Sequence, residues 1–515
     1  MGRTDSSWLV VHDVTVAPVS RILCVIVAIK NLRLQLEEFP MKTLTMPKMT
    51  RLALIALIIT GLVALPALLR GQGAAQGAVQ QVRHDPSKEL AMKITQPFTF
   101  AAVGDIIIRR PVGEGEAGYQ ALVKVMREAD MTYANMEGPI LDEVSFRGPL
   151  AGGPKSVVDE LKRMGVRIMT TANNHTLDAG TEGMFETHRL LAEAGIVHAG
   201  SGKNLADARL ARIAVTPKGT VAAVGMYSID ASSNNRSRFT DATADLPGLN
   251  PLHVTPYNVV TAEHMQALKK IRDAIYARRP EVRFPVAPVA ADEPAGRLQL
   301  FQTAFAVGPN PGDLTYEMDP TDLKGIITSV RLGKQLADFL VVAIHCHQNS
   351  FAFQAYSLDH HTPNFLIELA HQVIDNGADA FVGHGVHTLR GVEIYKGKPI
   401  FYGVSSFFYH RGTAPEITDR SAGPSSGDLV DDSLETLLTT SRFEDGKLVE
   451  VRLYPADLGQ DRMRPISRSG TPSTPSPEMA RRVLERLQTL SKQFGTTVSI
   501  QNGIGVIRVA SKQTN

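Results

Sequence analysis

Side chains that can bind metal ions follow five separate apolar segments of this sequence. They are Asp105, Glu137, Asn174, His345, His384 and His387. Carboxylates, imidazoles and one amide oxygen together suit a divalent Mn, Zn or Fe ion better than Ca²⁺, which is bound by oxygen ligands. The spacing therefore predicts a site that holds one or two divalent metal ions.

One histidine, His175, is the candidate catalytic residue because it directly follows the candidate ligand Asn174. An imidazole titrates close to neutral pH, so it can act as a general acid or as a donor to the transition state. The residues expected to support the site are Asn135, Asn173, Asp178 and His347. Divalent ions clamp a phosphoryl or carbonyl oxygen and activate water, so this set predicts a hydrolase-type site.

Short apolar runs alternate with amphipathic segments in the part of the chain that carries these residues. Strands are predicted at 97–103, 131–134, 166–170, 220–226, 339–344 and 378–382. Helices are predicted at 119–128, 154–164, 182–193, 262–277, 319–336 and 363–376. This alternation indicates an α/β fold, in which ligand sites lie at the C-terminal ends of the strands. We therefore expect the polar clusters to converge.

The N-terminal region has the pattern of a targeting segment. Arg51 precedes the charge-free apolar run 52–69, which small residues follow, so 41–78 is predicted to be a signal peptide or a membrane anchor. The run is long for a signal and just long enough to span a bilayer, so both alternatives stay open. Residues 1–40 are interpreted as an upstream extension. The expected location is extracytoplasmic, either secreted or periplasmic, or membrane-anchored.

The overall composition excludes some classes of protein. The chain has 515 residues and a net charge of only +2, and no Lys/Arg cluster is interleaved with aromatic residues, so nucleic acid is not an expected partner. The two cysteines are Cys24 and Cys346, and the first lies in the predicted targeting region. A mature chain would then have neither an internal disulfide nor a cysteine-based zinc site.

Three further segments are defined by their composition. Residues 279–320 are rich in Pro, Ala, Gly and Asp and are predicted to be an insertion or loop. Residues 411–432 are predicted to be a flexible linker, and 433–515 a small α+β appendage that packs on the main domain.

Five short motifs give the chain a family resemblance. They are Phe-Ala-Ala-Val-Gly-Asp (100–105), Tyr-Ala-Asn-Met-Glu-Gly-Pro (133–139), Thr-Thr-Ala-Asn-Asn-His-Thr-Leu-Asp-Ala-Gly (170–180), Val-Ala-Ile-His (342–345) and Val-Gly-His-Gly-Val-His (382–387). In this order they resemble the CapA family of poly-gamma-glutamate capsule biosynthesis, within the calcineurin-like metallophosphoesterase superfamily. The resemblance covers roughly 96–410. It implies a four-layer α/β sandwich; an open doubly wound sheet is the alternative, but no Gly-x-Gly-x-x-Gly follows the first strand.

The resemblance also implies roles for individual residues. Asp105 would be a ligand from the first strand, Glu137 a bridging or second ligand, Asn174 an amide ligand and His175 the catalytic histidine. The imidazole ligands would be His345, His384 and His387. The implied activity is metal-dependent phosphoester hydrolysis at a dinuclear site. Two alternatives stay open: an amide hydrolase, or a non-hydrolytic accessory of polyglutamate assembly or export.

The implied partners follow from the same resemblance. They are an anionic polymer or phosphoester substrate and membrane-bound capsule-synthesis proteins. Basic residues that could bind an anionic chain are Arg109, Arg110 and Lys155.

Several residues depart from the family pattern. Ile107 stands where the superfamily has the histidine of Asp-x-His, and Asn349 where the family usually has a glutamate. Ser405-Ser406-Phe407 stands in place of Gly-Asn-Phe. His347 could be a substitute ligand, because alternate residues of a strand share a face, and Cys346 would then point into the core.

Overall fold

The computed structural model describes residues 86–149, 151–230, 241–278, 295–300, 303–350, 360–410, 434–459 and 468–509. The chain divides into two units, Met1–His84 and Asp85–Asn515, and all described residues belong to the second. The predicted extension (1–40), targeting segment (41–78) and linker (411–432) lie outside the described residues. Within the described ranges, no helix is long and apolar enough to cross a membrane.

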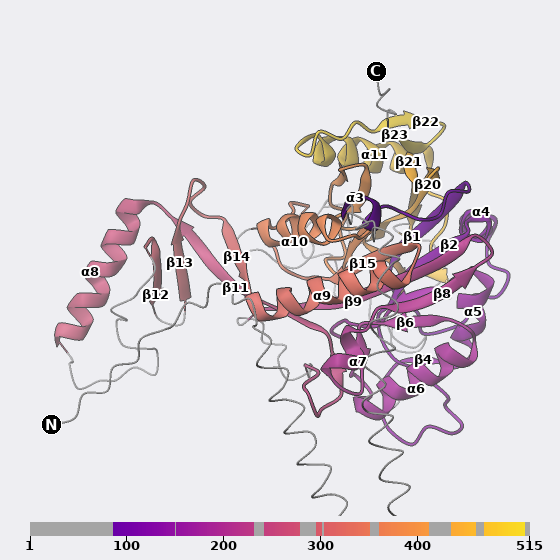
Figure 1. Ribbon diagram of the computed structural model, residues 1–515, viewed down its shortest axis with the longest axis horizontal. Helices are drawn as coiled ribbons and strands as arrows, with labels where there is room; N and C mark the ends of the chain where they lie inside the picture. Colours follow the sequence, from indigo (N-terminus) through magenta and orange to yellow (C-terminus); the bar gives the residue numbers. More distant parts are fainter. Residues whose placement is uncertain are drawn as a thin grey trace, which may run out of the picture. The chain divides into compact units, whose positions relative to one another are not determined.

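The first sheet has nine strands among the described residues (Figure 1). Their order is β22-β23-β21-β20-β1-β2-β5-β6, and β19 pairs with β1 beside this path. Their bounds are β1 Phe98–Ile107, β2 Met131–Met136, β5 Ile168–Thr170, β6 Val197–Ala199, β19 Ser406–Tyr409, β20 Glu435–Glu444, β21 Lys447–Asp457, β22 Ser499–Gln501 and β23 Ile504–Arg508. Strands β1, β2, β5, β6 and β19 run parallel, so their C-terminal ends lie at one edge.

The second sheet has ten strands among the described residues, in the order β12-β13-β11-β9-β15-β16-β18-β17, with β14 on β11 and β8 on β9. Their bounds are β8 Arg212–Thr216, β9 Gly219–Asp230, β11 Pro251–Val260, β12 Arg297–Leu300, β13 Thr303–Val307, β14 Leu314–Met318, β15 Phe339–His345, β16 Ala380–His384, β17 Val392–Tyr395 and β18 Lys398–Phe401. Strands β9, β15, β16 and β18 are parallel neighbours.

The helices and two short strand pairs complete the described part. The helices are α3 Pro86–Glu89, α4 Ala117–Glu128, α5 Val157–Arg163, α6 Gly180–Glu193, α7 Leu205–Arg209, α8 Ala262–Arg278, α9 Pro320–Leu336, α10 Asn364–Asp375 and α11 Pro477–Lys492. The strand pairs are β3 Ile140–Leu141 with β4 Gly153–Pro154, and β7 Ser201–Gly202 with β10 Gly248–Leu249. Helix α9 begins where the Asp319 carboxylate accepts backbone N–H bonds from Thr321 and Asp322.

Buried side chains on both faces of each sheet hold four layers together. In β1, Phe98 and Phe100 point into the core between the sheets, whereas Ala101 and Val103 point to the outer core beneath α4, α5 and α6. On the second sheet, the outer core joins β15 and β16 to α9 and α10. Strands buried on both faces are typical of parallel sheets covered by helices. The expected four-layer α/β sandwich is therefore confirmed.

Two segments differ from the sequence-based expectation. The predicted insertion or loop at 279–320 contains the strands β12, β13 and β14, which extend the second sheet with α8 beside them (Figure 1). They are short strands in a Pro- and Gly-rich context, so their apolar pattern was too brief to identify.

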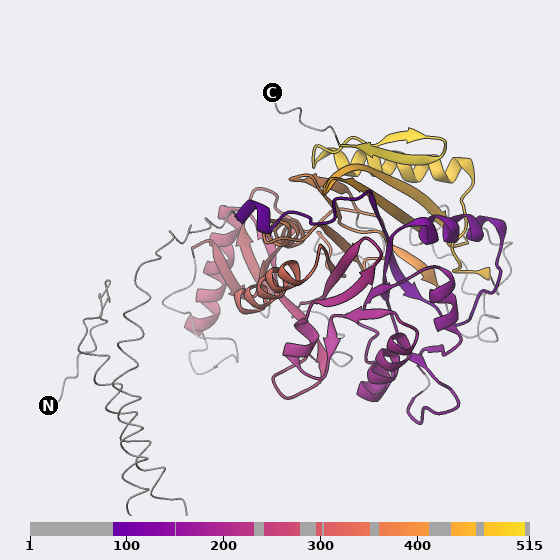
Figure 2. The ribbon, with the colours of Figure 1, turned by 45° about the vertical axis from the view of Figure 1, so that its right-hand side comes forward.

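The C-terminal segment does contain strands and a helix, but it is part of the first sheet. Strand β20 pairs antiparallel with β1, with Phe98 opposite Phe443, and β21 to β23 continue from it. Helix α11 adds Val483, Leu484 and Leu487 to the core between the sheets. Figure 2 shows the yellow helix lying against these strands. The segment completes the main core, which is more than the small appendage that we expected.

Candidate metal centre

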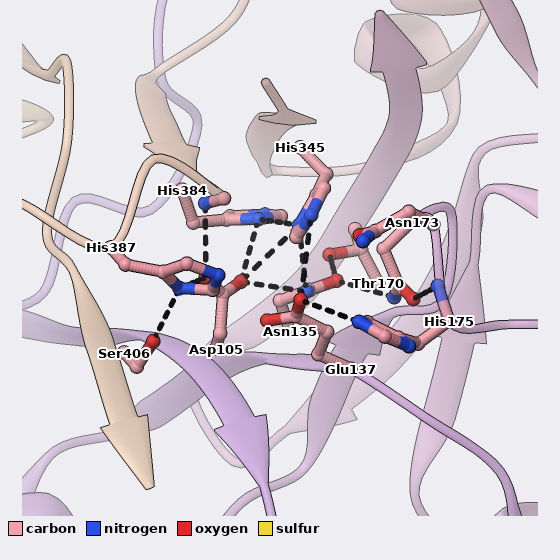
Figure 3. A network of polar contacts seen from close by, with 12 residues as sticks. Asp105, Asn135, Glu137, Thr170, Asn173, His175, His345, His384, His387 and Ser406 are labelled. Atoms are coloured by element: carbon pink, nitrogen blue, oxygen red, sulfur yellow. Dashed lines mark hydrogen bonds and ion pairs between the residues drawn. The ribbon is translucent and has the colours of Figure 1, made fainter. Parts of the chain in front are cut away.

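Strand register brings the predicted site residues together from both sheets. In the first sheet, Asp105 is opposite Asn135, and Asn135 is opposite Thr170. In the second sheet, His345 is opposite His384 at the ends of β15 and β16. Figure 3 shows the imidazoles of these two strands turned toward the carboxylates and amides of the first sheet. The centre therefore lies where the C-terminal ends of the two sets of strands face each other.

Asp105 is fully buried and accepts several hydrogen bonds. Asn135 Nδ2 donates to Oδ1 at 2.8 Å, and the backbone N–H of Gly385 donates to Oδ2 at 2.9 Å. A Cβ on Gly385 would lie 2.8 Å from the Cys346 nitrogen, so this close approach requires glycine. Burial raises the pKa of Asp105, but the charge of the neighbouring His345 is the largest of the effects that outweigh it and hold that pKa well below 3.8. Asp105 is thus a stable anion.

Glu137 is also buried, but its surroundings are very different. Both carboxylate oxygens lack a hydrogen-bond partner among the described residues. The nearest imidazole nitrogens are His345 Nε2 at 3.7 Å and His175 Nε2 at 3.9 Å from Oε1. Burial, together with the negative charge of Asp105, raises the pKa of Glu137 well above 4.5. A buried carboxylate of this kind needs either a proton or a cation.

His345 uses its two ring nitrogens on two sides of the centre. Nδ1 lies 3.3 Å from Asp105 Oδ1 and 3.1 Å from His384 Nδ1. Nε2 lies 3.0 Å from His347 Nε2 and faces Glu137. Burial lowers the pKa of His345 to about 4, and burial with the neighbouring imidazoles lowers the pKa of His347. Both rings are therefore neutral near pH 7, as metal ligands must be.

The loop after β5 carries the candidate catalytic histidine. Asn173 anchors this loop, since its Nδ2 donates to the Met136 carbonyl at 2.7 Å and its Oδ1 accepts from the His175 backbone N–H at 3.1 Å. His175 Nδ1 lies 2.7 Å from Asp178 Oδ2, which leaves Nε2 facing Glu137. Asn174 Oδ1 lies 3.2 Å from His347 Nε2. The loop thus presents an amide oxygen and an imidazole to one side of the centre.

His387 approaches Asp105 from the loop after β16. Its Nδ1 lies 2.8 Å from Ser406 Oγ and 3.8 Å from Asp105 Oδ2. His387 and Ser405 both have a left-handed backbone, with φ of 57° and 60°. Such conformations cost about 1–3 kcal/mol outside glycine and persist where the surrounding structure holds them. Two of the five non-glycine residues with positive φ among the described residues thus lie beside the centre.

The described donors fit a divalent ion. Three groups have ligand atoms within 4.8 Å of one another: Asp105/His345/His384, Glu137/His345/His347 and Asp105/Glu137/His387. Metal bonds of about 2.0–2.2 Å put the ligands of one tetrahedral ion about 3.3–3.6 Å apart. The atoms of the first group are separated by 3.1–3.3 Å. The unpartnered Glu137 carboxylate is the second indication, because a cation would satisfy it.

A model of the family described as bacterial capsule synthesis protein PGA_cap matches residues 99–410. The chain belongs to this family. It is 35% identical over 466 residues to the uncharacterized protein y4sH of Sinorhizobium fredii, covering 83% of this chain and 96% of that protein. It is 23% identical over 322 residues to the PGA biosynthesis protein CapA of Bacillus subtilis, covering 60% and 63% of the two chains.

A solved structure of a putative 5'-nucleotidase from Staphylococcus aureus is also similar to the chain. It has a TM-score of 0.33 and 10% identity, and the match covers 68% of this chain and 52% of that one. The family match confirms the CapA resemblance, and the sheets and helices of the chain itself define the fold.

Within this PGA_cap family member, the departures from the family pattern lie at defined places. Ile107 is partly buried at the end of β1 and offers no ligand. His347 lies at the centre, whereas Cys346 is buried in the outer core of the second sheet. The predicted ligands and supporting residues are therefore all brought to one region, and their roles remain predictions.

The sequence-based reasoning missed some residues of the polar network. Tyr133, Thr170 and Ser406 each lie within hydrogen-bond distance of a predicted site residue. Tyr133 could have been found, because it precedes Asn135 by two positions and alternate residues of a strand share a face.

Proposed function

We propose that this chain is an extracytoplasmic, metal-dependent hydrolase of phosphoesterase type that acts in capsule or poly-gamma-glutamate biosynthesis. The observation that carries the proposal is the Glu137 carboxylate, which is buried without a hydrogen-bond partner among neutral imidazoles. Family membership supports the link to capsule synthesis. The cluster of candidate metal ligands supports metal-dependent hydrolysis as the reaction class.

One or two divalent ions, Mn, Zn or Fe, would be held by residues from both sheets. The proposed ligands are Asp105, Glu137, Asn174, His345, His384 and His387, with His347 beside them. When bound, such ions polarise a phosphoryl oxygen and lower the pKa of a coordinated water molecule. The chain itself supplies the neutral imidazoles and buried carboxylates that such binding requires.

His175 would act as the general acid. Its Nδ1 is 2.7 Å from Asp178 Oδ2, so the carboxylate orients the ring. The other nitrogen, Nε2, faces the centre near Glu137. A proton at Nε2 could therefore be transferred to the leaving oxygen of a substrate.

The proposed substrate is a phosphoester or an anionic polymer. Arg109 and Arg110 follow β1 and are only partly exposed, and Arg110 donates to the Ser469 carbonyl. Lys155 already pairs with Asp142 at 3.2 Å, so it is the weakest of the basic candidates. Membrane-bound capsule-synthesis proteins are the proposed partners, which the predicted signal or anchor at 41–78 would bring close.

Ile107 favours a second candidate function. Because it removes one expected ligand from β1, the chain could bind an anionic polymer without hydrolysing it, as an accessory of polyglutamate assembly or export. This candidate predicts polymer binding with no turnover.

Metal analysis and a substrate screen test the proposal together. The purified chain should bind Mn²⁺ or Zn²⁺ and hydrolyse a generic phosphodiester, and Glu137→Gln should lower metal affinity at least about tenfold. Glu160→Gln is the matched control, since this buried carboxylate lies away from the centre and already accepts hydrogen bonds. His175→Gln should keep the metal and lose activity. Absence of metal binding would refute the proposal, whereas cleavage of polyglutamate but not phosphoesters would make the chain an amide hydrolase.

A further inference from the structure

A chain of buried hydrogen bonds lies behind the candidate ligands Asp105 and His384. Asn135 Nδ2 donates to Asp105 Oδ1 at 2.8 Å, and Thr170 Oγ1 donates to Asn135 Oδ1 at 3.1 Å. Tyr133 OH lies 2.5 Å from Thr170 Oγ1 and 3.1 Å from His384 Nε2. All five side chains are at most 1% exposed. These contacts form a ring, because His384 Nδ1 is 3.1 Å from Asp105 Oδ1.

The orientation of the Asn135 amide is determined by its neighbours on both sides. Its nitrogen faces the Asp105 carboxylate, which can only accept. Its oxygen faces Thr170 Oγ1 and lies 3.4 Å from Asn173 Nδ2, which are donors. The reversed amide would place an oxygen against the carboxylate and a nitrogen against another amide nitrogen. One orientation therefore satisfies every contact.

This orientation of the Asn135 amide determines which atom donates in each of the other hydrogen bonds of the network. The single hydroxyl hydrogen of Thr170 is used on Asn135, so Thr170 must accept from Tyr133 OH. The phenol hydrogen is then also used, so the Tyr133 oxygen can only accept from His384. His384 therefore carries its proton on Nε2, and the lone pair of its Nδ1 faces the Asp105 carboxylate (Figure 3).

A lone pair and a carboxylate oxygen repel each other at this distance unless a proton donor or a cation lies beside both. His345 Nδ1 is 3.1 Å from His384 Nδ1 and 3.3 Å from Asp105 Oδ1, so the three atoms surround one position that a cation could occupy. We infer that Tyr133 and Thr170 are positioning residues that hold His384 in the tautomer with a bare Nδ1 and so present this nitrogen, beside Asp105, to a divalent cation. The inference rests on the proposed metal site and goes beyond it, since it explains why neutral side chains behind the ligands control metal affinity. Partners of this kind orient ligand histidines in metal sites.

Tyr133→Phe removes the acceptor of the His384 Nε2 proton and leaves the ring in place. His384 is then free to carry its proton on Nδ1, where it would donate to Asp105 and compete with the cation. Affinity for Zn²⁺ and Mn²⁺, measured by chelator competition, should fall about 10–100-fold. Tyr402→Phe is the matched control, because its buried hydroxyl donates to Glu393 at 2.5 Å, away from the centre. It should lose stability but keep full metal affinity.

Thr170 gives a second test that does not depend on the folding of the first variant. Thr170→Val removes the hydroxyl at nearly constant shape and should weaken metal binding in the same way. Thr170→Ser keeps the hydroxyl and should restore affinity to within a few-fold of the parent chain.

Three outcomes separate the possibilities. Weaker Zn²⁺ binding by Tyr133→Phe and Thr170→Val, but not by Tyr402→Phe and Thr170→Ser, supports the inference. Equal metal affinity in all four variants overturns it and leaves the proposed function intact. If the parent chain binds neither Zn²⁺ nor Mn²⁺, the proposed function fails and this inference fails with it.

Discussion

Asp105 and Glu137 are two buried carboxylates of one centre with opposite surroundings. Asp105 accepts from Asn135 and from the Gly385 backbone, and its pKa lies well below 3.8. Glu137 accepts no hydrogen bond from the described residues, and its pKa lies well above 4.5. The first carboxylate is stabilised by the protein itself, whereas the second needs a cation or a proton. Burial alone therefore does not show which carboxylate needs a cation. The absence of a hydrogen-bond partner for Glu137 among the described residues does.

The largest expected effect comes from removing the well-bonded carboxylate. Asp105→Ala leaves the Gly385 N–H and one N–H of the Asn135 amide buried without an acceptor, at about 1–3 kcal/mol each, so the metal-free chain should lose about 2–6 kcal/mol of unfolding free energy. Urea unfolding in the presence of a chelator measures it. Asp105→Asn, which keeps an acceptor oxygen, should lose clearly less, and equal losses in the two variants would contradict the role given to these donors.

Replacing Glu137 should change the free energy of unfolding in the opposite direction. Glu137→Met replaces an unpartnered carboxylate by an apolar side chain of similar size, which removes a desolvation cost of about 1–3 kcal/mol. The metal-free variant should therefore be more stable than the parent chain in the same urea experiment. In excess Zn²⁺ this advantage should shrink or reverse, because the ion binds the parent chain more tightly and therefore stabilises it more than the variant. A destabilised metal-free variant would show that Glu137 has a protein partner after all.

The two carboxylates should also make opposite contributions to the pH dependence of stability in the metal-free chain. A raised pKa means that folded Glu137 keeps a proton that the unfolded chain releases, so stability falls as pH rises above 4.5, by up to about 1.4 kcal/mol per pH unit. Asp105 acts oppositely, since its lowered pKa contributes stability above 3.8 that is lost as pH falls.

Other groups also contribute to the pH dependence of stability, so the difference between two proteins is the useful quantity. The stability of the parent chain minus that of Glu137→Met, followed by urea unfolding in chelator, should decrease as pH rises above 4.5, until folded Glu137 itself ionises. A difference that stays constant would mean that Glu137 has an ordinary pKa.

Much of the fold could be predicted because its strands are local apolar patterns. The runs that became β1, β2, β15 and β16 are continuous and buried on both faces, which makes them visible in the sequence. The strands β12 to β14 are not visible in this way, since they are four or five residues long and partly exposed. The pairing of β20 with β1 depends on contacts across more than three hundred positions, which no local pattern contains.

The candidate site shows the same limit. Each predicted ligand lies at or just beyond the C-terminal end of a strand, so convergence could be expected from topology alone. What no spacing reveals is the direction of each hydrogen bond. The difference between Asp105 and Glu137 depends on Gly385, whose N–H reaches one carboxylate and not the other. Such a contact exists only after the two sheets have packed.

The smallest expected effect concerns the Asp105 side of the centre, where Ser406 Oγ lies 2.8 Å from His387 Nδ1. Ser406→Ala removes this one hydrogen bond, so the unfolding free energy should fall by only about 0.5–1.5 kcal/mol. Zn²⁺ affinity should fall only a few-fold, because His387 Nδ1 is 3.8 Å from Asp105 and outside the tighter Asp105/His345/His384 group. Ser441→Ala is the matched control, since this buried hydroxyl has no hydrogen-bond partner among the described residues. A loss of Zn²⁺ affinity in Ser406→Ala as large as that expected for Glu137→Gln would mean that His387 contributes as much to metal binding as Glu137. The contrast between the two carboxylates would then no longer account for where the ion is held.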